Sequence, residues 1–453
     1  MSTSVALYEA QQPLSHVNLA ETGGAMTIDK EVQFGDLILA FTTSYEYRWN
    51  DRGSGADDDV GFYHPIPPEG FFALGSIGLP NHDQPNGKFA SLCVKASPAT
   101  SGKKAPLAPP VRWEYVWDDS GSGADDDGSC WRPVPPEGYV ALGDVFVTGH
   151  SAPTGTQVMC VAKELVFEGK VGARIWTDNG SGADRDFGAW QVEVSRTFLD
   201  TPDGIFAVNS FAGTATHAQP QSSPVAWSLR LPLPTLEAEG PVKPTLTSRN
   251  RPPAHTNPVV DRVVTVPFTA VADSDKTLEW KVANSPFYNV ERSVQFDLLM
   301  FIDNDTNTAQ SQGTEVTTGV TKEQSQTFSI TTGITVSYES GIDAGGFSSK
   351  VSASLSIELG YSTTTSISQF RSETDQATLI AAPRHAAALW TEANTLRVFR
   401  ADGSPVGPAL GFQTADTAYV LSEFDFGPSS RPGAVKRGGS FSSRARSRLG
   451  NKR

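Results

Sequence analysis

Residues 325–363 read SQTFSITTGITVSYESGIDAGGFSSKVSASLSIELGYST. In the first half of this stretch the larger apolar residues fall on even positions, and in the second half they fall on odd positions. A period of two is typical of a β-strand with one apolar and one polar face. Two such runs on either side of ESGIDAGG predict a β-hairpin with a long tip.

The length of the two runs allows two interpretations. Each run spans about eleven residues, which at about 3.3 Å per residue gives roughly 36 Å of strand. Tilted by about 45°, such a strand nearly covers the roughly 30 Å hydrocarbon layer of a bilayer. A barrel of these hairpins would turn apolar residues to lipid and Ser or Thr to a wet lumen. The alternation alone favours the other interpretation, a half-buried pair of strands in a soluble sheet.

The membrane interpretation assigns a place to each side chain of the hairpin. The tip residues that could anchor across the far leaflet are Ile342 and Phe347, and the charged residues expected in the lumen are Glu339, Lys350 and Glu358. The residues expected to face lipid are Phe328, Ile330, Ile334, Val336, Tyr338, Val351, Leu355, Ile357, Leu359 and Tyr361.

Composition favours an all-β protein of two or three domains. The chain has 453 residues with 41 Gly and 31 Pro, and helix-period runs are scarce. Its formal charge is −14, and residues 429–453 hold eight Lys or Arg and no acid. The acidic body would repel nucleic acid, so we expect no nucleic-acid partner.

Several classes of function lack a signal in this sequence. The seven histidines look scattered, and GxSxG, P-loop and HExxH motifs are absent, so we expect no enzyme and no cofactor. Cys93, Cys130 and Cys160 occur without a CxxC, which predicts buried free thiols and no metal site. We also expect no signal peptide and no membrane-spanning helix.

The N-terminal half contains a threefold repeat. Residues 49–75 read WNDRGSGADDDVGFYHPIPPEGFFALG, and residues 117–143 read WDDSGSGADDDGSCWRPVPPEGYVALG. Residues 176–190, WTDNGSGADRDFGAW, form a third and weaker copy. Units of about 60 residues are too small to close a core alone, so three units around a pseudo-threefold axis are expected.

These motifs resemble the Vps62-type repeat family. The resemblance implies a β-prism of three four-stranded sheets, as in some plant lectins. The third copy departs from the pattern, because Arg185 follows Asp184 and TPDG replaces PPEG. The expected fold is therefore a pseudo-threefold β-prism over residues 1–240.

Three interpretations of the GSGA loops remain open. The loops could be surface turns in which Gly supplies positive φ, with Trp49, Trp117 and Trp176 as core anchors. Their carboxylates could instead bind Ca²⁺. The third possibility is a receptor or glycan site, and the residues assigned to it are Asp57, Asp59, Asp125, Asp127 and Trp131.

The chain changes character after the repeats. Residues 241–258 are expected to form a proline-rich linker. Residues 259–428 follow, with no proline between Phe287 and Ala382, which long uninterrupted strands require. Residues 429–453 are predicted to be a basic disordered tail that is cleaved for activation, binds anionic headgroups or only adds solubility.

The second domain resembles β-pore-forming proteins of the aerolysin or ETX/MTX2 type. The resemblance lies in SPFYNVER, NDTNTAQSQ, the Ser/Thr-rich strands around the hairpin and IAAP. It implies an elongated twisted sheet with an insertion hairpin that joins a shared barrel once protomers form a ring.

The two resemblances together predict a cytolytic, insecticidal type of toxin. A soluble protein acting outside the cell would bind a surface receptor, possibly a glycan, through the prism and then insert into the target lipid membrane. Two alternatives lack a pore: a soluble lectin-like binding protein, and an intracellular trafficking adaptor.

Overall fold

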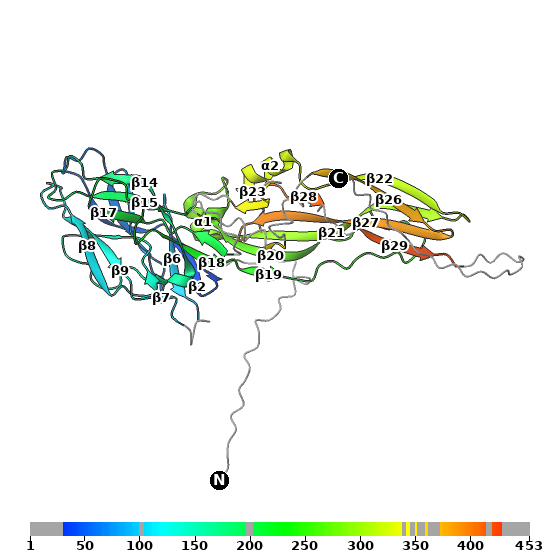
Figure 1. The fold of residues 1–453 in the computed structure, drawn as a ribbon, viewed down its shortest axis with the longest axis horizontal. Helices are drawn as coiled ribbons and strands as arrows, with labels where there is room; N and C mark the ends of the chain where they lie inside the picture. The colour runs from blue at the N-terminus through cyan, green and yellow to red at the C-terminus, as the bar shows by residue number, and fades with distance from the viewer. Residues whose placement is uncertain are drawn as a thin grey trace, which may run out of the picture.

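In a computed structural model the chain is an all-β protein built from two modules placed end to end (Figure 1). The structure describes residues 30–98, 104–195, 203–337, 341–344, 349–350, 358–360, 372–413 and 419–427. We call residues 30–232 the N-terminal module and residues 235–427 the C-terminal module. Within these ranges no helix is long and apolar enough to cross a membrane.

Each repeat of the N-terminal module contributes strands to two tiers of small antiparallel sheets. The outer tier, at the end remote from the C-terminal module, has three sheets of three strands. They are β3 (Tyr45–Asn50), β4 (Gly61–Pro65) and β5 (Ile77–Leu79); β8 (Arg112–Asp118), β9 (Gly128–Val134) and β11 (Val145–Thr148); and β14 (Lys170–Thr177), β15 (Gly188–Glu193) and β17 (Phe211–Thr214).

The inner tier adjoins the C-terminal module and repeats the same plan. Its sheets are β1 (Val32–Phe34), β2 (Leu37–Thr42) and β6 (Ser91–Ala96); β7 (Leu107–Ala108), β12 (Cys160–Ala162) and β10 (Tyr139–Val140); and β13 (Val166–Glu168), β18 (Trp227–Pro232) and β16 (Asp203–Phe206). A fourth strand, β25 (Ser349–Lys350), adds to β16 from a distant part of the chain.

The pseudo-threefold arrangement predicted from the repeats is present, but the predicted three four-stranded sheets are not. The described residues form six small sheets here, because the chain passes from one tier to the other within each repeat. In the first repeat this step occurs between Thr42 at the end of β2 and Tyr45 at the start of β3. Strands this short cannot run through both tiers.

The tryptophan that opens each repeat motif lies on the pseudo-threefold axis. Trp49, Trp117 and Trp176 are each 0% exposed, and their ring centroids lie 5.6, 5.7 and 6.1 Å apart. The pairs meet edge to face, the geometry that aromatic quadrupoles favour. The three rings therefore fill the centre of the outer tier, as expected if they are core anchors.

The C-terminal module is organised around two long neighbouring strands, β21 (Phe287–Asn304) and β27 (His385–Phe399). Around them lie β19 (Thr235–Glu237), β20 (Val259–Pro267), β28 (Leu410–Gln413) and β29 (Val420–Asp425). β22 (Gln310–Thr318) pairs separately with β26 (Glu373–Ala381). The proline-free stretch thus contains long strands, because no missing N–H group interrupts their ladders.

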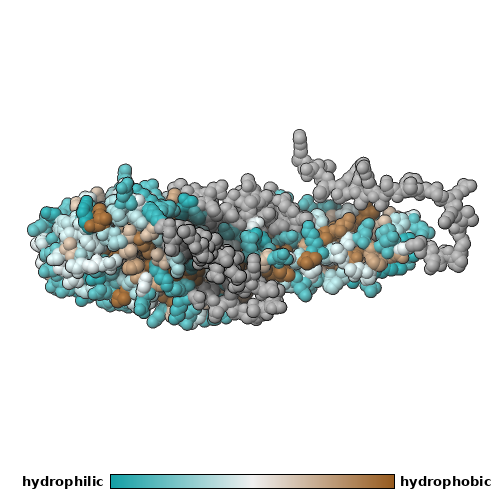
Figure 2. Space-filling model, turned by 90° about the horizontal axis from the view of Figure 1, so that it is seen from below, coloured by the Kyte–Doolittle hydropathy of each residue, from teal (hydrophilic) through white to brown (hydrophobic). Residues whose placement is uncertain are grey.

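The proline-rich linker lies along this module. The N–H group of Leu246 donates to Oγ of Ser422 over 2.9 Å, and that of Leu298 donates to the carbonyl of Ala254 over 2.7 Å. The chain reaches the second module earlier than the predicted boundary, because β19 already pairs with β20. In Figure 2 apolar atoms form a stripe on the C-terminal module, whereas the visible face of the N-terminal module is mostly hydrophilic.

The predicted first strand of the hairpin is wrong at Phe328 and Ile330, which lie in the helix α2 (Lys322–Thr332). Thr321 and Gln324 form a capping box at its start, and Gly333 ends it with φ of 73°. Phe328 and Thr332 are its buried residues, four positions apart on one helical face, while Ile330 is 78% exposed. A second α-helix, α1, spans Leu278–Asn284.

The rest of the predicted hairpin is only partly described. Ile334 and Val336 lie in β23 (Ile334–Ser337), which pairs with β24 (Gly341–Ala344). Ile342, predicted at the tip, is a strand residue opposite Val336. Glu358 is helical and Leu359 lies in the turn that follows it, so the predicted strand is wrong there too. The residues outside the described ranges are Tyr338, Glu339, Phe347, Val351, Leu355, Ile357 and Tyr361.

One apolar core crosses the junction between the modules. The ring of Phe287 lies 5.7 Å from that of Phe34 and 5.8 Å from that of Phe41, and Phe268 lies 4.8 Å from Phe41. Phe34 and Phe287 are each 0% exposed. The same cluster includes Leu229 and residues of the C-terminal sheet. The modules are therefore packed together and not merely tethered.

This shared core makes the two modules depend on one another. Replacing Phe287 with Ala should lower the free energy of unfolding by about 3–5 kcal/mol, the usual cost of removing a buried aromatic ring. Phe89→Ala is the control, because Phe89 is 38% exposed. Urea unfolding followed by tryptophan fluorescence measures both variants. If Phe287→Ala unfolds like Phe89→Ala, the junction is not a shared core.

Candidate functional site

The three GSGA loops (residues 51–60, 119–128 and 178–187) meet at the outer end of the N-terminal module and hold one another in a closed ring. The N–H group of Asp125 donates to the carbonyl of Arg52 over 2.7 Å. Asp184 donates in the same way to Ser120 over 2.8 Å, and Asp57 donates to Asn179 over 2.9 Å. Each loop is thus bonded to the next through its backbone, and the third closes on the first.

The buried tryptophans extend this ring inward. Nε1 of Trp49 donates to the carbonyl of Asp126 over 2.8 Å. Nε1 of Trp117 and of Trp176 donate to the carbonyls of Arg185 and Asp58 over 2.8 and 2.7 Å. Each indole therefore satisfies its polar group in the loop of a neighbouring repeat, which a buried Trp requires.

Asp58, Asp126 and Arg185 occupy equivalent positions in the three loops. Their contacts explain why the third repeat departs from the motif. Asp126 accepts a hydrogen bond from the hydroxyl of Tyr47 over 3.0 Å, and Asp58 pairs with Arg174 at 2.9 Å. Arg185, where the other loops have Asp, instead lies over the ring of Tyr115 at 5.1 Å. The substitution thus changes the interaction with the neighbouring repeat and leaves the ring of loops intact.

The residues predicted to bind a receptor or glycan fall into two groups, those that make contacts within the N-terminal module and those that lie beside a histidine. Asp57 and Asp125 are exposed but make the backbone bonds between loops, and Asp57 also accepts from Nδ2 of Asn179. Trp131 packs edge to face on Tyr115 and donates from Nε1 to Ser129. These contacts are structural. Binding by the exposed carboxylates stays a prediction.

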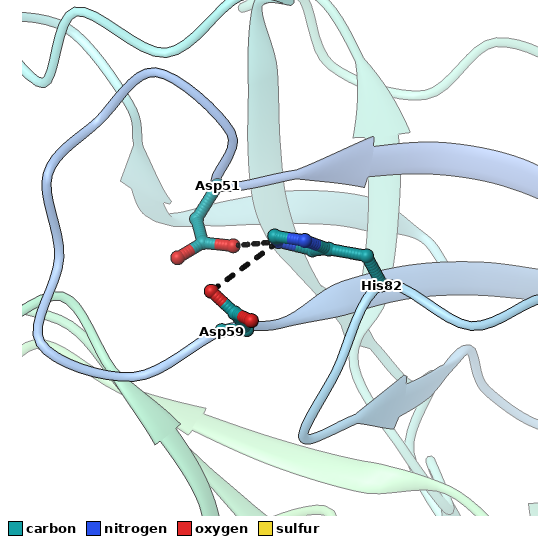
Figure 3. A group of neighbouring side chains, drawn as sticks. All are labelled: Asp51, Asp59 and His82. Atoms are coloured by element: carbon teal, nitrogen blue, oxygen red, sulfur yellow. Dashed lines mark hydrogen bonds and ion pairs between the residues drawn. The ribbon is translucent and has the colours of Figure 1, made fainter.

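Asp59 and Asp127 belong to a different arrangement, an Asp–Asp–His triad in each repeat. In the first repeat, Nε2 of His82 lies 2.6 Å from Oδ1 of Asp51 and 3.9 Å from Oδ1 of Asp59 (Figure 3). The side chain of Asp51 is 4% exposed, whereas that of Asp59 is 68% exposed. The triad thus has a buried end and an open end.

The second repeat builds the same arrangement, and the third brings together the same residue types, but their ligand atoms do not all lie within 4.8 Å of one another. Nε2 of His150 lies 2.6 Å from Oδ1 of Asp119, with Asp127 beside them, and the ligand atoms of these three residues lie within 4.8 Å of one another, as they do in the first triad. Nε2 of His217 lies 2.6 Å from Asp178 and 3.8 Å from Asp186. We call these nine residues the three triads.

Local sequence explains how each buried aspartate is held. Oδ1 of Asp51 also accepts the N–H group of Val60 over 2.9 Å, which closes the loop across nine residues. Gly128 and Phe187 donate in the same way to Asp119 and Asp178, over 3.0 and 2.7 Å. These bonds fix the carboxylates before any ligand binds.

The electrostatic environments of the histidines differ. The hydrogen bond with the carboxylate of Asp119 raises the pKa of His150, so its imidazole gains a proton more readily. His64, which contacts Ser76 and the carbonyl of Gln157, is buried, and burial lowers its pKa to about 4. His64 is therefore a neutral core residue.

The sequence analysis missed the triads. The view of the histidines as scattered is wrong for His82, His150 and His217. The signal was the spacing, because the first two lie 31 residues after their buried aspartate and the third lies 39 residues after its own. Cys93, Cys130 and Cys160 are buried free thiols, as expected, and burial raises the pKa of Cys93 to about 12.

The second candidate site is the part of the C-terminal module that holds the predicted hairpin. We call the described residues of this part, 322–337, 341–344, 349–350 and 358–360, the docked segment. The ring of Phe328 and the side chains of Ile334 and Leu359 lie in the core that joins the modules. A side chain at Gly333 would come within 2.6 Å of the backbone nitrogen of Ala272, so the segment lies close against the module at this point.

Two arginines and one strand pairing hold the far end of the docked segment. Nη1 of Arg262 donates to the carbonyl of Glu358 over 3.1 Å, and Nη1 of Arg292 donates to that of Leu359 over 2.6 Å. Lys350, in β25, lies opposite Ile205 in β16 of the N-terminal module. The segment thus contacts both modules.

Comparisons with known proteins fit this division into modules. Residues 8–229 match the family described as "Vacuolar protein sorting-associated protein 62", and residues 259–410 match the family described as "Insecticidal Crystal Toxin, P42". No match is found among curated proteins. The chain is therefore a β-protein that is similar to a Vps62 family over its N-terminal module and to an insecticidal toxin family over its C-terminal module. The finer resemblance to the aerolysin or ETX/MTX2 type stays a prediction.

Two solved structures are similar to parts of the chain. One is GNIP1Aa from Chromobacterium piscinae, with 31% identity, a TM-score of 0.34, and coverage of 40% of this chain and 34% of that chain. The chain thus spans about a third of that protein. The other is Cry35Ab1, with 13% identity, a TM-score of 0.35, and coverage of 86% and 90%.

The ring of loops can be tested with two glycines of one loop. Gly53 and Gly55 have φ of 84° and 77°, so alanine costs about 1–2 kcal/mol of backbone strain at either position. A Cβ at Gly53 would also lie 3.0 Å from the carbonyl of Gly123, whereas one at Gly55 meets nothing nearer than 3.9 Å. We expect Gly53→Ala to destabilise the protein by about 1–3 kcal/mol more than Gly55→Ala in thermal unfolding. Equal effects would show that the loops do not interlock.

Proposed function

We propose that this protein is a β-pore-forming toxin of the insecticidal type. The N-terminal module binds a receptor or glycan on the target cell, and the C-terminal module assembles into a homo-oligomeric ring. The docked segment then leaves its site and refolds as an amphipathic hairpin. Hairpins from all protomers close a transmembrane barrel, with Lys350 and Glu358 toward the lumen.

The observation that carries this proposal is the match of residues 259–410 to the insecticidal crystal toxin family, because this range encloses the docked segment. Within the described residues, β23 and β24 pair only with one another, and β25 pairs with the N-terminal module. The segment can therefore depart without breaking the ladder between β21 and β27. The long central strands would remain as a rigid frame.

Release of the docked segment costs free energy, because buried side chains become exposed. Phe328, Ile334 and Leu359 are each at most 1% exposed, and burial of such side chains is worth about 1.5–3 kcal/mol apiece. The two arginine contacts and β25 add to this sum. Barrel closure can offset the cost, because it pairs every strand edge and places apolar side chains in lipid.

The N-terminal module suits the role of receptor binding. It presents three equivalent loops at the end remote from the docked segment, each with an exposed carboxylate at Asp59, Asp127 or Asp186. Three equal contacts on one surface favour a target with repeated groups, such as a glycan, because linked contacts bind more strongly than one.

A soluble binding protein or trafficking adaptor that makes no pore is the second candidate. The observation that favours it is helix α2, because residues 322–332 would have to lose a capped helix before they could join a barrel. The match of the N-terminal module to a family named for vacuolar sorting points in the same direction.

A disulfide between the docked segment and the N-terminal module distinguishes these candidates. Ile205 and Lys350 are opposite residues on antiparallel strands, where Cα atoms lie about 4.5–5.5 Å apart, within the range of a disulfide. The variant Ile205→Cys/Lys350→Cys should release no dye from vesicles made of target-cell membrane when oxidised. It should release dye when reduced, because the segment is then free.

The two single variants are the controls, and each should release dye under both conditions. Binding to the vesicles is measured in parallel and should be unchanged by the disulfide. Release by the oxidised double variant would contradict departure of the segment. Binding of the wild-type protein without any release would favour the second candidate.

A further inference from the structure

We propose that the first two triads, Asp51–Asp59–His82 and Asp119–Asp127–His150, are each a site for one divalent cation of the zinc or manganese class, so that the N-terminal module binds two cations. This inference concerns the N-terminal module alone and does not depend on pore formation. It rests on the donor atoms of the triads, on how they are held, and on a residue that the loops do not need for their own structure.

The donor atoms converge from separate parts of each repeat. In the first triad, Asp51 follows β3, Asp59 precedes β4, and His82 lies beyond β5. Figure 3 shows the imidazole edge directed toward the two carboxylates. The ligand atoms of the first two triads lie within 4.8 Å of one another, close enough to share one ion.

The chemistry of the donors selects the class of cation. An imidazole nitrogen with two carboxylate oxygens suits Zn²⁺ or Mn²⁺, whereas Ca²⁺ and Mg²⁺ prefer oxygen ligands alone. Tetrahedral zinc with ligands at about 2.0–2.1 Å places donor atoms about 3.3 Å apart. Nε2 of His82 lies 2.6 and 3.9 Å from the two carboxylate oxygens, so binding of zinc would lengthen the first separation and shorten the second by about 0.6–0.7 Å each.

Part of each site is already fixed in position. The buried carboxylate of Asp51 accepts the N–H group of Val60, an outer contact of the kind that orients metal ligands. Asp59 at the open end is exposed. A cation held here would keep coordination positions toward solvent, where water or a hydroxyl or carboxylate of a partner could bind.

A structural role for the triads explains the buried aspartate and the histidine but not the third residue. A hydrogen bond between His82 and Asp51 is enough to close the loop, and Val60 already assists it. Asp59 makes neither bond, yet the third repeat also places a carboxylate there, Asp186, 3.8 Å from the imidazole. It does so although its histidine lies eight residues farther along the chain. A bound cation would explain why a second carboxylate lies beside the imidazole, because it would be a metal ligand.

Isothermal titration calorimetry of the full chain with zinc chloride tests the proposal. The wild-type protein should bind two Zn²⁺ ions per chain. Asp127→Asn should bind one, because one triad loses a ligand. Asp126→Asn is the matched control, since it removes the same charge from the adjacent position of the same loop, and it should still bind two. Both side chains are exposed, so both variants should fold.

A second pair of variants tests the histidine. His150→Gln should bind one Zn²⁺ ion, whereas His255→Gln, which changes an exposed histidine outside the triads, should bind two. Three results would overturn the proposal: no saturable binding by the wild-type protein, two sites in Asp127→Asn, or two sites in His150→Gln. Equal binding of calcium chloride, unaffected by His150→Gln, would also overturn it, because carboxylates alone would then account for the sites.

Discussion

The apolar core at the junction of the two modules is the interaction on which the rest of the structure depends. It takes Phe34 and Phe41 from the N-terminal module and Phe287 from the C-terminal sheet. It also takes Phe328 and Leu359 from the docked segment. Three parts of the chain that are distant in sequence thus bury their apolar surface in one place. None of them can move without exposing surface of the others.

The two ends of the N-terminal module are held in different ways. At the outer end, the GSGA loops form a closed ring around Trp49, Trp117 and Trp176, so the surface they present is rigid. At the junction, the docked segment is held by a few buried side chains, by Arg262 and Arg292, and by β25. Under the proposed function, the ring of loops would attach to the target and the docked segment would then leave the junction.

The sequence predicted those features that local pattern determines. The repeated WxD and GSGA motifs revealed the pseudo-threefold module, because each repeat builds the same turn with its own residues. The absence of proline between Phe287 and Ala382 predicted long strands, and β21 alone has 18 residues. The tiers of the N-terminal module were not predicted, because a change of sheet between Thr42 and Tyr45 leaves no mark in the hydrophobic pattern.

The errors arose where one pattern fits two structures or where contacts are distant in sequence. Phe328 and Thr332 lie four residues apart, which suits a helix face as well as a strand face, and the capping box of Thr321 and Gln324 decides for the helix. The triads were missed because His82, His150 and His217 lie in loops outside the repeated motif. The pairing of Lys350 with Ile205 has no local signal at all.

The central claim is that the docked segment crosses a membrane after it leaves the shared core. Electrical recording across a planar bilayer made from target-cell membrane tests this claim most directly, with bound protein quantified on the same membrane. The account predicts discrete steps of conductance that persist after unbound protein is washed away. Bound protein with no conductance steps would contradict it.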